Sequence, residues 1–267
     1  MFQIQGNVDF EFKANEFIKG VIINDLNGDG LNDLIVTVQI TPGNSTIYFL
    51  PYDANLKMYS PKTKVVIATS VVASEPTIFQ RFDNQRNLLV PYLIVQKATR
   101  FVYTVASNGS VSEQPFDQFV VASSGCLPYS QVSSRGLGLA ETKGGSVADL
   151  NGDCIPDMVL ESADGTNSPF LEFYYYQQGN GQDIPAGFCL VGIVPNGANS
   201  LTATFIDLNN DGATDLVLVN SETLRVDVHL NRFTSTDLQN LCVTNDSKSL
   251  PYIGINTDDV SSVLFLS

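Results

Sequence analysis

The chain has 267 residues, of which 43% are hydrophobic and 10% aromatic, so it can bury a core and is not disordered as a whole. Its 28 aspartates and glutamates outnumber its 14 lysines and arginines, which gives a formal net charge of -14. This acidic balance argues against nucleic acids and anionic membrane surfaces as partners, because neutralising phosphates needs lysine and arginine.

Residues 1–7 lack the basic and apolar stretches of a secretory signal peptide. No signal peptide is therefore expected within this chain. No run of about 18 apolar residues follows, so we expect no membrane insertion by this segment, although a parent protein with an anchor stays an open alternative.

Short apolar runs rich in β-branched residues follow one another along the chain, separated by Gly, Asn, Asp, Ser or Pro. The clearest runs lie at residues 34–38, 65–68, 88–90, 92–95, 119–121 and 216–219. No window of a dozen residues keeps a clear helical period. The pattern predicts an all-β protein with few, short helices.

Three segments, residues 23–36, 147–160 and 205–218, align with one another without gaps. Each contains the pattern D-x-N-x-D-x-x-x-D followed by an apolar run. The copies start 124 residues apart (25 to 149) and then 58 residues apart (149 to 207). A repeat of about 60 residues therefore predicts a degenerate copy at residues 82–90. A partial further copy is expected at residues 255–266.

A repeat of this length with several short strands fits one four-stranded blade of a β-propeller. A blade cannot bury both faces alone, so neighbouring repeats must stack. We expect residues 1–267 to form a single β-propeller domain, or part of one, with four blades and a partial fifth.

The pattern places oxygen-bearing side chains at positions 1, 3, 5 and 9 of each aspartate loop, with a backbone carbonyl at position 7. These loops are named the first (residues 25–33), second (149–157) and third (207–215) loops. Their expected ligands are Asp25, Asn27, Asp29, Leu31 and Asp33; Asp149, Asn151, Asp153, Ile155 and Asp157; and Asp207, Asn209, Asp211, Ala213 and Asp215. Such a set of hard oxygen ligands suits Ca²⁺ better than Mg²⁺, and two to three calcium ions are expected per chain.

Position 6 needs a left-handed turn, which Gly30 and Gly212 suit. Cys154 occupies that position in the second loop, so the second loop is expected to be the weakest site. Nine of the chain's 28 acidic residues are loop aspartates. Three carboxylates held close together repel one another unless a cation lies between them.

Three other interpretations of the loops were weighed. An EF-hand or dockerin loop needs an acidic residue at position 12, where these loops have Val36, Leu160 and Leu218. The nonapeptide repeats of calcium-binding β-helices are absent. The remaining alternative is that the loops are simple hairpin turns, which three copies in register make improbable.

With an apolar strand after each, the three loops resemble FG-GAP/VCBS repeats, the calcium-binding blades of integrin α-subunit propellers. The run from Asp149 to Asp157 and the spacing of the blades are also similar to the T-cell immunomodulatory protein family, whose ectodomain is a propeller of such repeats. The resemblance implies an integrin-like, extracellular or cell-surface adhesion module in which calcium is structural.

Two further features are compatible with the secretory pathway. N-glycosylation sequons occur at Asn44, Asn108 and Asn245. The disulfide candidates are Cys126, Cys154, Cys189 and Cys242, which contain no C-x-x-C pair. Cysteines 126, 189 and 242 lie about one repeat apart, so some could join neighbouring blades, and the pairing is left open.

No catalytic constellation is found. The single histidine, His229, lies in a strand-like alternation, and no G-x-S-x-G accompanies it. Residues 174–176 are three tyrosines, expected to pack within a strand rather than to stack on sugars. We expect a non-enzymatic, calcium-stabilised recognition or adhesion module that binds a protein or glycan ligand at the propeller rim. A carbohydrate-binding propeller lectin and a self-assembling surface-filament subunit stay open as alternatives.

Overall fold

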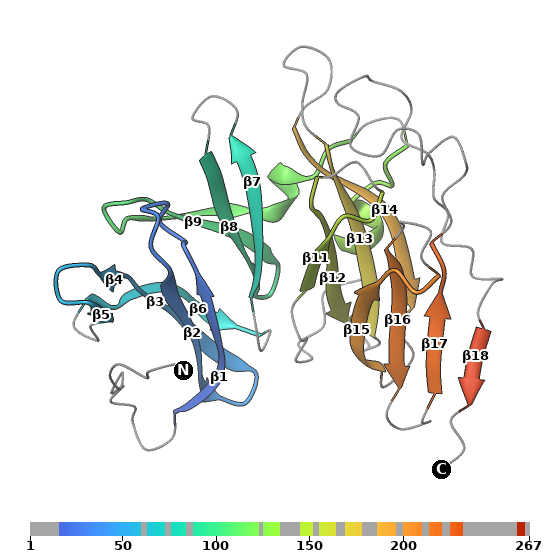
Figure 1. Cartoon of the computed structure of the whole chain (residues 1–267), viewed down its shortest axis with the longest axis horizontal. Coiled ribbons are helices and arrows are strands. Elements are labelled where there is room, and N and C mark those ends of the chain that lie inside the picture. Colours follow the sequence, from blue (N-terminus) through green and yellow to red (C-terminus); the bar gives the residue numbers. More distant parts are fainter. Residues whose placement is uncertain are drawn as a thin grey trace. The chain divides into compact units, whose positions relative to one another are not determined.

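The computed structural model describes residues 16–59, 63–72, 76–83, 88–122, 125–133, 145–151, 155–163, 169–177, 186–195, 200–209, 214–220, 225–231 and 261–264. Within them the chain forms four four-stranded sheets and one small two-stranded hairpin (Figure 1). Helix is confined to short segments, among them the 3₁₀ helix η2 (Phe116–Phe119) and α1 (Ser130–Ser133). The expectation of an all-β chain is confirmed.

Each four-stranded sheet takes consecutive strands in spatial order, and all neighbours are antiparallel. The first sheet contains β1 (Phe17–Asn24), β2 (Asp33–Thr41), β3 (Asn44–Leu50) and β6 (Val65–Val71). The second contains β7 (Thr77–Asp83), β8 (Leu88–Gln96), β9 (Arg100–Val105) and β10 (Val111–Pro115). The third contains β11 (Gly145–Ala148), β12 (Asp157–Ala163), β13 (Pro169–Gln177) and β14 (Gly187–Pro195). The fourth contains β15 (Ser200–Ile206), β16 (Asp215–Asn220), β17 (Arg225–His229) and β18 (Ser261–Leu264).

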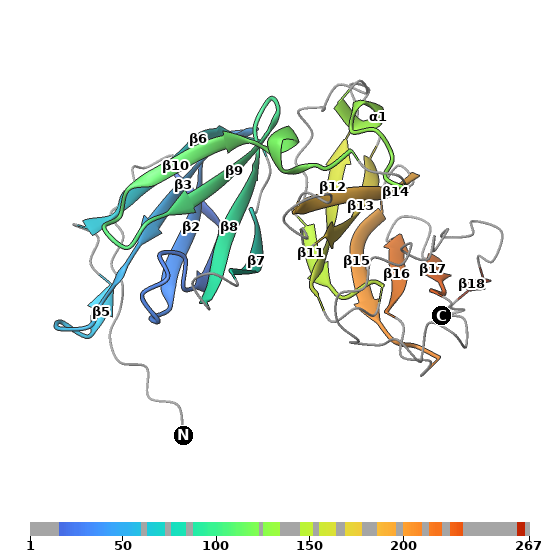
Figure 2. The same ribbon diagram turned by 90° about the horizontal axis from the view of Figure 1, so that it is seen from above.

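The sheets belong to two compact units (Figure 2). Unit 1 comprises Met1–Phe116 and Leu139–Gly144 and holds the first and second sheets. Unit 2 comprises Asp117–Gly138 and Gly145–Ser267 and holds the third and fourth. Four-stranded antiparallel sheets of this kind are what the repeat predicted, and a closed propeller stays a prediction.

In unit 1 the first and second sheets pack through one face each. Their shared core consists of Leu26, Ile35, Ile47, Phe49, Ile67, Ala68, Val71, Leu93, Val95, Tyr103 and Val105. Alternate residues of β3, β8 and β9 point into it, as the period of two in a strand requires. Gln80 Nε2 also donates a hydrogen bond across the sheets to Asn24 Oδ1 at 3.1 Å.

In unit 2 the third and fourth sheets share an equivalent core. It consists of Leu150, Val159, Leu171, Phe173, Tyr175, Leu216 and Leu218. Both cores include the residue that follows the first aspartate of a loop, Leu26 in unit 1 and Leu150 in unit 2. The first and second loops are therefore anchored in the hydrophobic cores at their starting ends, whereas the corresponding Leu208 of the third loop is 45% exposed.

The free edge of β14 is covered by an edge segment made of residues 119–122 and 125–127. Val121 N donates to Phe188 O at 2.9 Å and Leu127 N donates to Leu190 O at 2.7 Å, with a parallel bridge between Val120 and Phe188. Unpaired strand edges are prone to pair with other chains, so this cover protects the third sheet.

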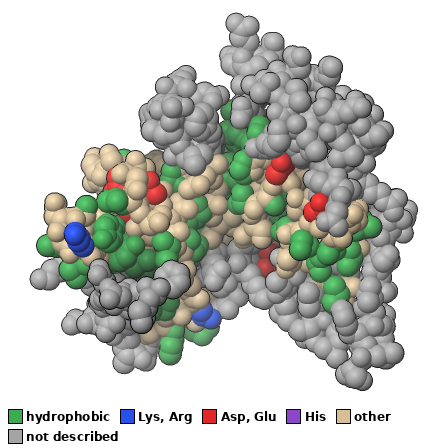
Figure 3. Space-filling view, in the orientation of Figure 1, with side chains coloured by type: hydrophobic (Ala, Val, Ile, Leu, Met, Phe, Trp, Pro, Cys, Tyr) green, Lys and Arg blue, Asp and Glu red, His purple; other side chains and the backbone are tan. Residues whose placement is uncertain are grey.

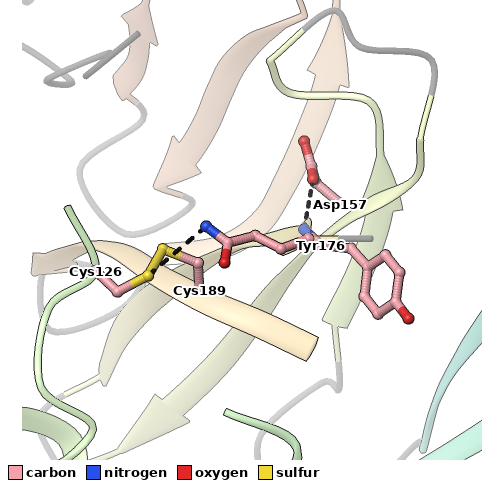
Figure 4. Close-up of a disulfide and its surroundings, with 5 residues drawn as sticks. Cys126, Asp157, Tyr176 and Cys189 are labelled. Carbon is pink, nitrogen blue, oxygen red and sulfur yellow. Dashed lines mark hydrogen bonds between the residues drawn. A yellow bond between two sulfur atoms is a disulfide. The ribbon is translucent and has the colours of Figure 1, made fainter. Parts of the chain in front are cut away.

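A disulfide between Cys126 and Cys189 fastens the edge segment to β14 (Figure 4). The two cysteines are 63 residues apart and their Cα atoms are 5.2 Å apart. In the chain-entropy account, closing a loop of this length stabilises the fold by about 4 kcal/mol. The pair thus joins a connecting segment to a sheet rather than one blade to the next, and Cys154 and Cys242 lie outside the described residues.

One face of the first sheet, opposite the core of unit 1, carries exposed apolar side chains. Val21 and Ile23 of β1 are 51% and 62% exposed, and Ile18 and Val66 are also exposed. Beneath them lies a small cluster of Val36, Val38 and Leu50. Figure 3 shows hydrophobic side chains over this sheet. This outer face of the first sheet has the composition of a face that packs against another surface.

Two sequence expectations concern weaker copies of the repeat. The hairpin of β7 and β8 occupies the place of the degenerate copy at 82–90, with Asp83 paired to Leu88 and residues 84–87 outside the described part. The stretch expected to open a fifth unit, 255–266, instead supplies β18, which pairs with β17 as the last strand of the fourth sheet. β18 has only four residues, so sequence alone did not distinguish it from the start of a new repeat.

The contact between the edge segment and β14 can be tested at Gly187. A Cβ atom there would lie 2.5 Å from Phe119 O and 2.8 Å from Val121 Cγ1. We expect Gly187→Ala to lower the free energy of unfolding by about 1–3 kcal/mol in urea denaturation, because the backbone must shift. Gly192→Ala is the control, since its added Cβ would meet only Phe173, at 3.8 Å. Equal effects at both glycines would contradict the described contact.

Candidate metal centres in the aspartate loops

All three aspartate loops join the first two strands of a sheet. The first loop joins β1 to β2, the second joins β11 to β12 and the third joins β15 to β16. The first loop is described completely. In the second and third loops the expected ligands Asp153, Asp211 and Ala213 lie outside the described residues.

The carboxylate of Asp25, at position 1, is the centre of the first loop. Its Oδ1 accepts hydrogen bonds from the backbone amides of Gly28 at 2.8 Å and Asp29 at 3.1 Å, and its Oδ2 accepts one from Gly30 at 2.8 Å. Three amides around one carboxylate wrap the loop into a tight turn.

Asn27 and Asp29 continue this turn. Asn27 Nδ2 donates to Asp29 Oδ2 at 2.9 Å, and Asp29 Oδ1 accepts the amide of Leu31 at 2.8 Å. Gly28 and Gly30 adopt φ angles of +72° and +84°, which a side chain would strain. The expected left-handed position of Gly30 is confirmed, and Gly28 is a second such position that the sequence pattern did not single out.

The aspartate at position 9 is fully buried in every loop and holds two strand ends together. Asp33, Asp157 and Asp215 are each 0% exposed. One carboxylate oxygen accepts the amide of the residue at position 2, and the other accepts an amide just beyond or near the end of the third strand. The position-2 bonds come from Leu26 at 3.1 Å, Leu150 at 2.9 Å and Leu208 at 2.8 Å. The third-strand bonds come from Tyr52 at 3.0 Å, Tyr176 at 2.9 Å and Asn231 at 2.7 Å.

We call this pair of bonds the aspartate clamp, and Figure 4 shows its Tyr176–Asp157 bond. The clamp ties the loop's start to the strand two places along the sheet. It therefore fixes the ends of three strands with one side chain. Each carboxylate oxygen accepts one clamp amide and has a second lone pair for another partner.

Burial and like charge act together on Asp33. Burial is the larger cause and raises the pKa of this carboxyl to about 6, while the amides of Tyr52 and Leu26 lower it and the charges of Asp29 and Asp25 raise it further. A carboxylate buried beside two others is the setting in which a bound cation would lower the electrostatic cost.

The donor chemistry of the first loop fits calcium, since it offers only carboxylate, amide and carbonyl oxygens. Its side chains in this structure are turned toward the loop's own amides. Among the described residues, which include all of the first loop, His, Cys, Asp and Glu do not form a group of three or more spaced to hold a metal ion.

The second loop is tied to residues that flank β16 and β17 of the neighbouring sheet. Thr214 Oγ1 donates to Asp149 O at 2.8 Å. Asn231 Nδ2 donates to Leu150 O at 2.7 Å and to Thr214 O at 3.2 Å. The side-chain oxygen of Asn231 is buried and has no hydrogen-bond partner among the described atoms.

Sequence reasoning found the loop residues but missed the clamp partners and Thr214. The partners are backbone amides, which any residue except proline supplies, so residue type carries no signal. The spacing from the ninth aspartate to the partner, 19, 19 and 16 residues in the three loops, is the pattern that could have located them.

The remaining sequence candidates have simple places in the fold. Tyr174, Tyr175 and Tyr176 are buried in β13, so the expected strand packing is confirmed. His229 lies in β17, opposite Leu216 of β16. The sequon residues Asn44 and Asn108 are both exposed, and Asn245 lies outside the described residues.

The aspartate clamp predicts a stability loss that does not depend on metal. In Asp157→Asn one carboxylate oxygen becomes an NH₂ group facing a backbone N–H. We expect the free energy of unfolding to fall by about 1–3 kcal/mol in chelator-treated protein, because a buried amide loses its acceptor. The exposed Asp117→Asn is the control. Unchanged stability of Asp157→Asn in urea denaturation would show that the clamp contributes nothing.

Residues 146–218 match the family of FG-GAP-like repeats. The match begins within β11 and ends within β16, so it includes the second and third loops and most of the third sheet. A comparison with curated proteins finds no match to the chain. The narrower likeness to T-cell immunomodulatory protein ectodomains is not supported by these comparisons. This part of the chain is thus similar to FG-GAP repeat proteins, which suggests an extracellular, adhesion-type module.

Proposed function

We propose that this chain is a calcium-stabilised extracellular recognition or adhesion module without enzymatic activity. The observation that supports it most is the recurrence of one loop architecture in three sheets, and two of these loops, the second and the third, lie in the FG-GAP-like match. Calcium would be held by the expected ligands of the first, second and third loops. The metal would supply positive charge among buried carboxylates, and the chain's own clamp would hold the strands.

The proposed location outside the cell is supported by two independent features. The Cys126–Cys189 disulfide is typical of oxidising compartments, and FG-GAP repeats are consistent with the same location. No helix in the described part of the chain is long and apolar enough to cross a membrane.

We propose that the four sheets are blades of a propeller and that a protein ligand binds at the loop rim. The β4 (Tyr52–Asp53) and β5 (Met58–Tyr59) hairpin stands beside the first loop. Tyr59 OH donates to Asn32 O at 2.9 Å, and Leu56 at the hairpin tip is 62% exposed. This apolar tip supports a protein ligand over a glycan, and the burial of the β13 tyrosines removes the one aromatic patch that favoured a lectin.

Calcium dependence is the direct test. Thermal unfolding is measured in millimolar calcium and in chelator, together with the metal content. We expect two to three bound calcium ions and a Tm drop on chelation of roughly 5–10 °C for each ion lost, because each site at 100 times its Kd adds about 2.7 kcal/mol. In Asp29→Asn the calcium content should fall by one ion, whereas the control Asp53→Asn in the β4–β5 hairpin should keep it. Equal Tm values and no bound metal would contradict the proposal.

Self-assembly is a second candidate function, favoured by the exposed outer face of the first sheet. Two apolar side chains that are half or more exposed on one strand, Val21 and Ile23, favour burial against a second surface. If copies associate through this face, the sedimentation coefficient should rise with concentration, and Val21→Lys with Ile23→Lys should abolish the rise. Leu56→Lys, at the exposed tip of the β4–β5 hairpin, is the control. A wild-type coefficient independent of concentration would exclude self-assembly.

A further inference from the structure

We propose that Asn231 couples the second and third aspartate loops, so that ordering either loop favours ordering the other. The coupling itself does not need a metal. Its consequence for calcium rests on the proposed function.

The argument begins with what distinguishes the three clamp partners. Tyr52, Tyr176 and Asn231 each give a backbone amide to a ninth aspartate. The rings of Tyr52 and Tyr176 pack edge-on against Tyr59 and Phe188 of their own sheets. The side chain of Asn231 instead crosses to the neighbouring sheet.

The crossing makes a continuous path between two clamps. Asp215 Oδ1 accepts the amide of Asn231 at 2.7 Å, and Asn231 Nδ2 donates to Leu150 O at 2.7 Å. The amide of Leu150 in turn donates to Asp157 Oδ2 at 2.9 Å. Asn231 and Leu150 therefore each donate a backbone amide to the aspartate of their own clamp. A second bond, from Asn231 Nδ2 to Leu150 O, joins the two clamps.

The orientation of the Asn231 amide is fixed by its acceptors. Its NH₂ group meets two carbonyls, Leu150 O at 2.7 Å and Thr214 O at 3.2 Å. The reversed amide would place an oxygen against two oxygens, which repel, so Nδ2 is the bridging atom.

A second bond acts on the same stretch of the second loop. Thr214, which directly precedes the clamping Asp215, donates its hydroxyl to Asp149 O at 2.8 Å. Two successive carbonyls at the start of the second loop thus accept hydrogen bonds from the neighbouring sheet. Asp149 O accepts one from Thr214, and Leu150 O accepts one from Asn231. In this structure both bonds are present together with the second and third clamps.

Two loops that share such bonds lose less conformational entropy together than separately. A cation that orders the third loop would hold Thr214 and Asn231 in place, and the second loop would then bind its own cation at a smaller ordering cost. Linkage requires the same factor in the other direction. The effect would be largest for the second loop, which carries Cys154 in place of glycine.

The coupling is tested first without metal, by a double-mutant cycle in chelator. Asp157→Asn and Asp215→Asn are measured singly and together by thermal unfolding, with Asn231 present and in an Asn231→Ala background. With Asn231 we expect the Tm loss of the double variant to differ from the sum of the single losses by about 2–4 °C. In Asn231→Ala the losses should add. Additive losses with Asn231 present would overturn the coupling.

Calcium titration is the second arm and uses chains with the first loop disabled by Asp25→Asn. Adding Asp149→Asn leaves the third loop alone, and adding Asp207→Asn leaves the second loop alone. The coupling factor is the overall calcium association constant of the chain with both loops, divided by the product of the association constants of the two single-loop chains. We expect this factor to be about 5, and to fall to 1 in Asn231→Ala. A purely structural role for Asn231 would weaken binding without changing this ratio.

Two controls complete the design. Thr214→Val removes only the second bond and should reduce the ratio partly, whereas Asn108→Ala, in the turn between β9 and β10 of unit 1, should leave it unchanged. A ratio of 1 with Asn231 present contradicts the proposal. If no calcium binds to any chain, the proposed function fails, and the metal-free cycle alone decides the coupling.

Discussion

The structure depends on a buried carboxylate that accepts two backbone amides. Asp33, Asp157 and Asp215 each place a carboxyl group in a site with no exposed surface. Such burial is costly unless hydrogen bonds offset it. The two amides provide that offset. One belongs to the start of the loop, and the other lies near or just beyond the end of the third strand. The same side chain therefore stabilises a loop, a hairpin and the end of a third strand.

The structure gives the loop aspartates a second role, as acceptors of backbone amides, beside the role of cation ligand that the sequence pattern predicts. From the pattern D-x-N-x-D-x-x-x-D alone, all of these side-chain oxygens are predicted to be ligands of a cation. In the first loop Asp25 and Asp29 organise the turn by accepting loop amides, whereas Asp33 reaches out of the loop to Tyr52. A cation would therefore bind a loop in which Asp33 is already held by backbone amides, while Asp25 and Asp29 lie in the exposed part of the loop.

Much of the fold was predictable because the same loop and strand pattern occurs three times, so that a pattern too weak to interpret once becomes informative. One short strand is ambiguous, but three aligned copies with a fixed spacing establish the unit, and the four-stranded antiparallel sheets follow from its length. The clamp partners were not predictable, because a backbone amide leaves no trace in residue type. Nor was the disulfide partner of Cys126, because four cysteines allow three pairings and their spacing does not choose among them. The last strand, β18, has only four residues, and the sequence alone placed it in a possible partial repeat at residues 255–266 rather than in the fourth sheet.

The use of a backbone donor has a consequence for how the repeats can diverge. Substitution at positions 52, 176 and 231 cannot remove the amide unless proline enters, so selection on the clamp leaves the side chain there unconstrained. In this chain one copy uses that freedom for a tyrosine pair, another for a tyrosine packed on phenylalanine, and the third for an asparagine that reaches the adjacent sheet. The three sheets that contain a clamp thus keep the same pair of backbone hydrogen bonds, while the side chain at the donor position contacts a different neighbour in each.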